Sequence, residues 1–346
     1  MDRNDQKASC IFGARYMLTQ VEALQGEIQG ALIGDDIEHV HRMRVGSRRL
    51  RNGLNLFSDC LPKNKAKAWR KSIRAITQSL GHARDLDIQI ELINCCCAGI
   101  LDERLQPGYN RLLLRLKQQR NLAQESVHQT LDHLQKVGAL DAIGAKLTNL
   151  TAYSENVHLV TPSLYQRAFE AISTNLDEFL SYENDIHDPE NITELHAMRI
   201  AGKHLRYTLE VFALLYGQAL NPLIRTMKDI QDLLGEIHDN DVWILWLPEF
   251  IQQEGVCIEA YFGHRGPLKR LLPGLNHFIE DRRRVRSDQY QAFLTLWEAL
   301  QDEQAWGIMR EIITVPMKVE DALALLPAAP EPDEAEAGGE DDTGTG

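Results

Sequence analysis

The segment from His41 to Arg51 reads HRMRVGSRRLR, and the segment from His196 to Arg206 reads HAMRIAGKHLR. At this offset of 155 residues the His, the Met, the Leu and two Arg are identical, while Val faces Ile and Arg faces Lys. Two amphipathic sequences this alike within one chain indicate an internal repeat.

Two more matches follow in the same order. Residues 80–87, LGHARDLD, align with residues 234–241, LGEIHDND, at an offset of 154. Residues 107–110, PGYN, align with residues 273–276, PGLN, at an offset of 166. Three collinear matches predict a tandem duplication whose halves pack with pseudo-two-fold symmetry.

Hydrophobic periodicity predicts helices throughout the chain. Apolar residues recur at three- and four-residue spacing, as at Ile88, Leu92 and Ile93, and alternating β-rich runs are nearly absent. Pro and Gly interrupt the pattern about every helix length, which leaves about four long segments in each half. We therefore expect an all-α fold, a tandem duplication with about four long helices in each half. The expected halves are residues 1–150 and 151–315, followed by an acidic disordered tail over residues 316–346.

The charge of the chain is unevenly distributed. The formal net charge is −13, but the last eighteen residues, 329–346, hold seven acids and no base, and this polar, proline-containing composition predicts disorder. Residues 39–51 hold five arginines, two histidines and no acid. A low average charge therefore conceals a strong local positive field.

The repeated segments place cations on one helical face. His41, Arg44, Arg48 and Arg51 lie at positions 0, +3, +7 and +10, which share one face over about 15 Å of helix axis. The second half repeats this spacing, and each half adds two cations on the following helix; these residues are His196, Arg199, Lys203 and Arg206, then Lys71 and Arg74, and Arg225 and Lys228.

A single basic run on a helix is more often a solvated face than a binding site. Like charges at this spacing repel each other, so their presence in both halves favours an anion-binding site over stability alone. Two more arginines, Arg282 and Arg286, extend the site or form a solvated face, and the sequence does not decide between these alternatives.

The paired segments resemble the signature segments of the CHAD family, the conserved histidine α-helical domain, from about residue 8 to 312. The resemblance implies two four-helix bundles with a basic groove or pore, which bind inorganic polyphosphate and associate with polyphosphate granules in the cytoplasm. It assigns the basic-motif positions to His41, Arg44, Arg48, Arg51, His196, Arg199, Lys203 and Arg206. Arg49 is a further candidate ligand. Ala197 and His204 stand where the first half has Arg42 and Arg49, so the second half is expected to bind polyphosphate less tightly.

The physical chemistry of arginine suits such a ligand. Its planar guanidinium bonds two phosphate oxygens at once, and each charge-assisted bond contributes about 1.5–3 kcal/mol before ordering costs. The arginines around His41 and His196 should depress the pKa of both imidazoles, and a bound phosphate should raise it. We therefore expect tighter binding near pH 6 than near pH 8.

Other chemistries find less support in the sequence. The pairs Asp85/Asp87 and Asp239/Asp241 could hold Mg²⁺ for a polyphosphatase, but helix capping or ion pairing with arginines is the favoured interpretation. Histidines eight residues apart lie about 12 Å apart, too far to chelate one metal ion. No P-loop, HExxH or GxSxG motif occurs, so we expect a non-catalytic protein without a cofactor. Net acidity and the lack of aromatics among the arginines argue against nucleic acid as the partner.

The remaining features concern the compartment. No apolar run approaches the length of a membrane span, so we expect no membrane association. The six cysteines include the consecutive Cys95, Cys96 and Cys97, which fit neither a disulfide framework nor CxxC metal spacing. They predict reduced thiols in a cytoplasmic protein. The sequence leaves the oligomeric state open.

Overall fold

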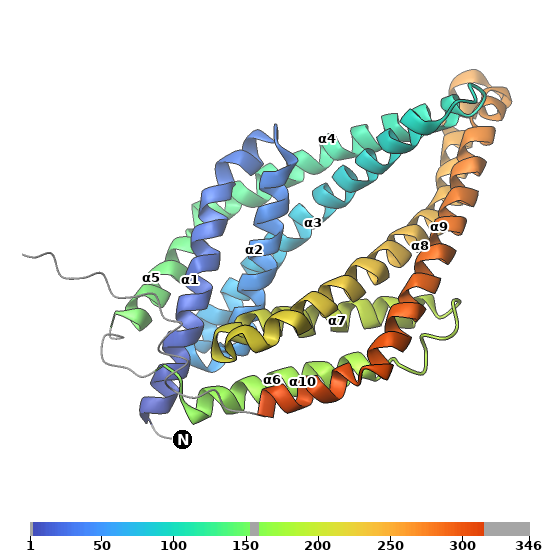
Figure 1. The fold of residues 1–346 in the computed structure, drawn as a ribbon. Helices are drawn as coiled ribbons and strands as arrows, with labels where there is room; N and C mark the ends of the chain where they lie inside the picture. Colours follow the sequence, from blue (N-terminus) through green and yellow to red (C-terminus); the bar gives the residue numbers. More distant parts are fainter. Residues whose placement is uncertain (1–2, 153–158, 315–346) are drawn as a thin grey trace, which may run out of the picture.

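The computed structural model describes residues 3–152 and 159–314. Within these residues every regular element is a helix, as predicted (Figure 1). The first half contains α1 (Arg3–Ile33), α2 (Ile37–Leu56), the short η1 (Ser58–Cys60), α3 (Lys63–Gly99), α4 (Gln106–Val137) and α5 (Ala139–Thr151). The second contains α6 (Pro162–Leu180), α7 (Ile192–Phe212), η2 (Ala213–Leu215), η3 (Gly217–Ala219), α8 (Leu220–Phe262), η4 (Gly266–Arg270), α9 (Leu272–Asp302) and α10 (Ala305–Thr314).

Over the described residues, each half has one α-helix more than the predicted four. Among the described residues, α5 and α10 follow the four long segments of their halves, and each packs back on the first helix of its own half, α1 or α6. Both added helices are short, so the sequence breaks did not separate them from their neighbours. Helix α5 ends one residue beyond the predicted boundary at 150, and the predicted tail, 316–346, lies outside the described residues.

Local sequence fixes the helix that carries the first basic row. Asp36 caps α2 by accepting a hydrogen bond from the Glu38 amide at 2.9 Å. The inward face of α2 is apolar, and Met43, Leu50 and Leu54 are fully buried. The arginines between these positions, Arg44, Arg48 and Arg51, are half-buried on another side of the helix.

The two halves meet through helices that hold the same place in the helix order of each half. The described contacts between halves include α1 with α6, α2 with α7, and α4 with α9. Such pairing of each element with its own counterpart is what a two-fold relation between halves produces. The tandem duplication itself remains an interpretation of the sequence repeats.

The contact between halves at one end is aromatic and ionic. The rings of Phe12, Phe57 and Phe212 lie 6.0–6.3 Å apart between centroids. Arg167 of α6 pairs with Asp59 of η1 at 2.6 Å. These contacts join α1 and the end of α2 to α6 and α7.

The contact at the other end is made by glycines. Gly108 at the start of α4 packs on Gly274 at the start of α9, and a Cβ added to Gly274 would lie 2.0 Å from the Leu105 carbonyl oxygen. Figure 1 shows the α3–α4 and α8–α9 hairpins meeting at this tip. The third sequence repeat, PGYN and PGLN, is therefore one of the places where the halves touch.

One prediction about the cysteines was wrong. Cys10 of α1 and Cys60 of η1 form a disulfide bond, with their Cα atoms 5.3 Å apart. The two cysteines lie 50 residues apart in the sequence, a separation from which pairing cannot be deduced. Cys95, Cys96, Cys97 and Cys257 are free thiols, as expected.

Candidate functional site: a basic groove between the halves

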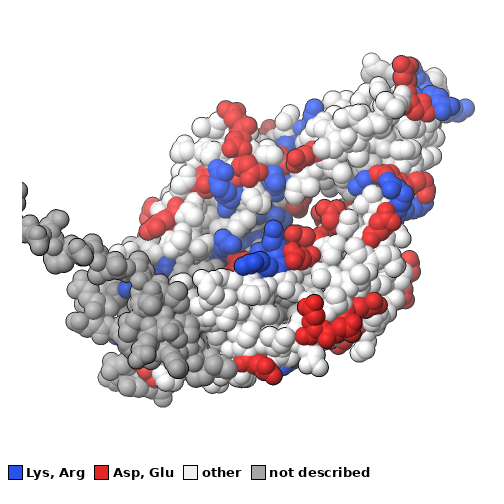
Figure 2. Space-filling model, in the orientation of Figure 1, with Lys and Arg blue, Asp and Glu red and all other residues white. Residues whose placement is uncertain are grey.

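The two predicted basic rows face each other across the contact between α2 and α7. The positive charges of Arg44, Arg48 and Arg51 on α2 all act on Lys203 of α7, as does that of its neighbour Arg199. Figure 2 shows Lys and Arg side chains gathered in a hollow in the middle of one face, with Asp and Glu around its edge. We call the surface formed by these five residues and the side chains beside them the basic groove.

The groove depresses the proton affinity of its own cations. Burial, and then the neighbouring arginines, lower the pKa of Lys203 to about 7. Burial is also the largest cause that lowers the pKa values of Arg44 and Arg199, although both guanidiniums stay charged at physiological pH. Cations held this close and partly dehydrated are stabilised by an anion.

The matched arginines leave equivalent donors without partners. The Nε atoms of Arg44 and Arg199 are both buried and have no hydrogen-bond acceptor. Arg44 reaches one carboxylate, Asp85, through its Nη2 at 3.2 Å. Because a buried N–H without an acceptor costs about 1–3 kcal/mol, two such donors at equivalent positions indicate a site that an anion completes.

Each histidine of the repeat lies at the α3 or α8 side of its row. His41 on α2 has a buried Nδ1 without a partner, and burial together with the charge of Arg84 on α3 lowers its pKa. His196 on α7 lies with its Nδ1 2.9 Å from the Nδ1 of His238 on α8, and burial, then Arg199 and Lys203, lower the pKa of His196. Both histidine pKa values are therefore lowered, as expected, but burial rather than the neighbouring arginines is the largest cause.

Asp85 and Asp239 are the acidic members of the groove. Asp239 is exposed, yet desolvation is the largest cause that raises its pKa to about 6, opposed by the charge of Arg199. The charge of Asp85 also raises the pKa of Asp239, so the two matched carboxylates approach each other from opposite halves.

The profile of the CHAD domain matches residues 15–248, about two thirds of the chain. The chain belongs to the CHAD family. Two uncharacterized proteins, from two strains of Mycobacterium tuberculosis, are 28% identical to it over 232 residues, which cover 61% of this chain. The chain spans 40% of the length of these curated relatives.

Solved structures share the fold. The crystal structure of the CHAD domain from the plant Ricinus communis matches with a TM-score of 0.57 and 24% identity, over 82% of this chain and 91% of that one. PptA from Streptomyces chartreusis matches with a TM-score of 0.54 and 15% identity, over 84% of this chain and 99% of that one. Both likenesses show a shared all-α fold.

Two arginines predicted as ligands in this CHAD chain are held by a carboxylate instead. Glu210 of α7 pairs with Arg49 at 2.9 Å and with Arg206 at 3.0 Å. Arg206 also lies over the ring of Tyr207, 5.0 Å from its centroid. This cluster joins α2 to α7 at one end of the basic groove, and it therefore helps to hold the two halves together.

The two arginines of α9 are likewise paired. Arg286 bonds Asp241 at 2.5 Å and donates to the Pro189 carbonyl at 2.6 Å. Arg282 is buried, pairs with its neighbour Asp281, and donates to the Asn240 side chain at 3.3 Å. The structure therefore places both inside the α8–α9 packing rather than on a solvated face.

The matched aspartates follow the favoured interpretation in one position. Asp87 pairs with Arg120 of α4 at 2.6 Å, just as Asp241 pairs with Arg286. These ion pairs tie the two helices of each long hairpin together. Within the described residues no cluster of three or more His, Cys, Asp or Glu side chains has metal-binding geometry.

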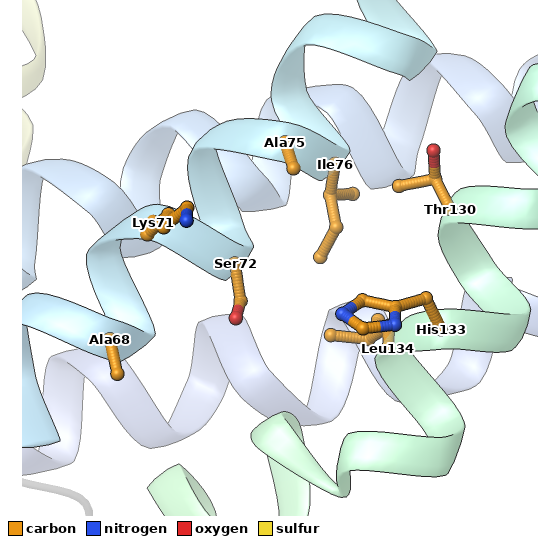
Figure 3. A pocket seen from close by; sticks show the side chains of 8 residues that line it. All are labelled: Ala68, Lys71, Ser72, Ala75, Ile76, Thr130, His133 and Leu134. Carbon is orange, nitrogen blue, oxygen red and sulfur yellow. The ribbon is translucent and has the colours of Figure 1, made fainter.

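The cations predicted on the following helix lie apart from the centre of the groove. Arg74 is exposed and close enough to lower the pKa of Arg51, after burial and Arg48. Arg225 and Lys228 of α8 are exposed, and Lys228 lies 4.0 Å from Asp232. Lys71 borders a pocket of about 250 Å³ between α3 and α4, whose other lining residues include Ser72, Thr130 and His133 (Figure 3).

Sequence reasoning missed two groove residues, Arg84 and His238. They occupy the same position of the second repeat, one residue before Asp85 and Asp239. The alignment of LGHARDLD with LGEIHDND contained the signal. Because Arg84 and His238 differ in residue type, we considered only the matched aspartates beside them.

No described helix is long and apolar enough to cross a membrane.

Proposed function

We propose that this chain binds inorganic polyphosphate in the basic groove and catalyses no reaction on it. The observation that carries the proposal is the convergence of Arg44, Arg48 and Arg51 with Arg199 and Lys203 from the other half. A linear polyanion engages many cations along one chain, so each added contact is intramolecular and raises the overall affinity.

The groove suits a phosphate chain better than a nucleic acid. Its aromatic member, Tyr207, is buried under the cations and offers no open ring face on which a base could stack. Recognition through charge and guanidinium geometry needs no base contacts. Binding should therefore weaken steeply with salt, as it does for other polyanions whose counterions are released.

Two ion pairs support a binding role over catalysis. A polyphosphatase needs carboxylates available for a metal ion and a positioned water. Of the four matched aspartates, Asp87 and Asp241 are bound by Arg120 and Arg286.

Association with polyphosphate granules in the cytoplasm is the corollary that the CHAD resemblance implies. The Cys10–Cys60 disulfide bond is unusual for that compartment, so thiol labelling of the protein in its cells tests the location separately.

The test of binding is calorimetry with long-chain polyphosphate at two salt concentrations. The variant Arg44→Ala/Arg199→Ala removes both guanidiniums with orphaned donors, and Arg104→Ala/Arg283→Ala removes two exposed arginines elsewhere as a matched control. Two charge-assisted bonds predict a loss of about 10²- to 10⁴-fold in affinity for the first variant. The control should stay close to wild type.

Competition separates the ligand classes. Duplex DNA or tRNA at moderate salt should not displace polyphosphate at equal phosphate concentration. A folded wild-type protein without affinity for polyphosphate would refute the proposal, and so would equal losses in the two double variants. Displacement by nucleic acid would replace polyphosphate with nucleic acid as the ligand.

A further inference from the structure

One of the matched positions at which the two halves differ lies directly before the aspartates of the second repeat. Arg84 of α3 and His238 of α8 precede the matched aspartates, and each lies beside the histidine of its own half. Arg84 has a buried Nε and Nη1 without hydrogen-bond partners, and its nearest carboxylate, Glu38, lies 3.8 Å away. The first half therefore presents a permanent cation where the second presents an imidazole.

The imidazoles of His196 and His238 form a hydrogen-bonded pair. Their Nδ1 atoms lie 2.9 Å apart, and their ring centroids 4.1 Å. In the neutral pair each ring carries one N–H. The ring whose Nδ1 donates has a lone pair on Nε2, and the ring whose Nδ1 accepts has its proton on Nε2. One added proton preserves the shared hydrogen bond and turns that lone pair into a second Nε2–H donor.

The surroundings keep the empty pair neutral. Burial, and then the charges of Arg199, His196 and Lys203, lower the pKa of His238 to about 3. Arg199 and Lys203 also act on His196 from the same helix, α7. An anion that neutralises these two cations removes the repulsion and adds an attraction for the proton, so binding and protonation favour each other.

Other groups of the groove also titrate. The pKa values of three more groups are shifted, those of Lys203, of His41 on α2 and of Asp239 on α8. The charges that act on His41 are those of Arg84, Glu38, Arg44 and Arg42. The charges that act on Asp239 are those of Arg199, Asp85, Glu236 and Arg44. Total proton uptake therefore reports the whole groove. The pair is distinguished by its own imidazole signals and by exchange of residues between the halves.

We propose that the His196–His238 pair is a proton-gated phosphate subsite, whereas His41 and Arg84 form a subsite that is cationic at every physiological pH. The inference rests on the proposed function, since the ligand is the same polyphosphate chain. On binding, the pair takes one proton from solvent and presents two Nε2–H donors with one positive charge. The second half then binds the chain more tightly when the pair can take up this proton.

The direct test is NMR of the wild-type protein labelled in its histidine rings. Addition of long-chain polyphosphate at pH 7 should move the ring nitrogen signals of this pair from the neutral toward the cationic pattern. Single variants His196→Gln and His238→Gln assign the signals. Signals of His133, which borders the α3–α4 pocket, should stay unchanged.

Reciprocal exchange provides the second readout. His238→Arg gives the second half the cation of the first, and Arg84→His gives the first half an imidazole. As the pH falls, the affinity of the wild type for polyphosphate should rise by up to about tenfold per pH unit, over the range in which binding is coupled to uptake of one proton by the pair. His238→Arg should flatten this dependence between pH 8 and pH 6, and Arg84→His should steepen it. His133→Gln should leave it as in the wild type.

The outcomes separate the two proposals. Polyphosphate binding with the imidazole pair still neutral would overturn the proton-gated subsite and leave the proposed function standing. Exchanged variants that keep the wild-type pH dependence would overturn the subsite in the same way. Absence of binding by the folded wild type at pH 6 would instead refute the proposed function.

Discussion

Replacement of Gly274 by alanine should destabilise the chain by about 2 kcal/mol. The added Cβ would lie 2.0 Å from the Leu105 carbonyl oxygen, 3.0 Å from its carbon and 3.1 Å from the Gly108 Cα. The closest approach falls about 1.4 Å short of ordinary contact, and all three atoms belong to backbone, which cannot rotate away as a side chain does. Overpacking costs about 1–3 kcal/mol, and the rigid neighbours place this site at the upper end, less about 0.5–1 kcal/mol that alanine regains in a helix.

Thermal unfolding followed by circular dichroism measures the effect, with an expected drop in Tm of about 3 °C for a chain of this size. Gly26→Ala in α1 is the matched control, because its Cβ would meet nothing within 4 Å. The control should gain up to about 1 kcal/mol from helix propensity alone, so the two alanines should act with opposite signs. If Gly274→Ala raised Tm as Gly26→Ala does, the close contact between the halves at the hairpin tip would be refuted.

Three further predictions concern groups whose surroundings are unusual. Arg286→Ala leaves the buried Asp241 carboxylate without its cation and should cost about 3–5 kcal/mol in urea unfolding, more than Asp241→Asn does; equal losses would contradict the ion-pair argument. The pKa of Lys203, about 7, lies below its ordinary value, so the unfolded chain holds this proton more tightly and stability rises with pH from about 7 toward 10. Lys203→Met should therefore gain about 1–3 kcal/mol at pH 6, with the gain shrinking by pH 9.5, while polyphosphate affinity falls; a gain that is independent of pH would assign the effect to packing. Reduction of the Cys10–Cys60 bond by a dithiol should lower the free energy of unfolding by up to about 4 kcal/mol, because the bond closes a loop of 50 residues. A Cys10→Ser variant that unfolds as the wild type does would show that the bond contributes nothing.

The helices and their polar faces were accessible from local patterns. Spacing of 0, +3, +7 and +10 places Arg44, Arg48 and Arg51 on one side of α2 whatever surrounds it, because helix geometry is local. The same holds for the inward residues Met43, Leu50 and Leu54, all fully buried. These features required no knowledge of the other half.

Partner choice was not accessible in this way. Arg49 and Arg51 lie two residues apart on one helix, yet Arg49 pairs with Glu210 of the other half while Arg51 lies among cations. Spacing alone cannot tell a groove arginine from an interface arginine, because the difference is which residue of a distant helix lies opposite. The disulfide bond escaped for the same reason, since Cys10 and Cys60 are brought together by the packing of α1 against the end of α2.

The sequence by itself determined that this chain is all-α, that cations repeat along two of its helices, and that paired Pro-Gly segments mark corresponding places in its halves. Only the tertiary structure decided that those two helices face each other, which carboxylates remove arginines from the groove, and that His196 meets His238 where His41 meets Arg84. The physical reason is range. Helix periodicity follows from backbone geometry within a few residues, whereas the charge that one side chain feels depends on elements more than a hundred residues away that packing brings within a few ångströms.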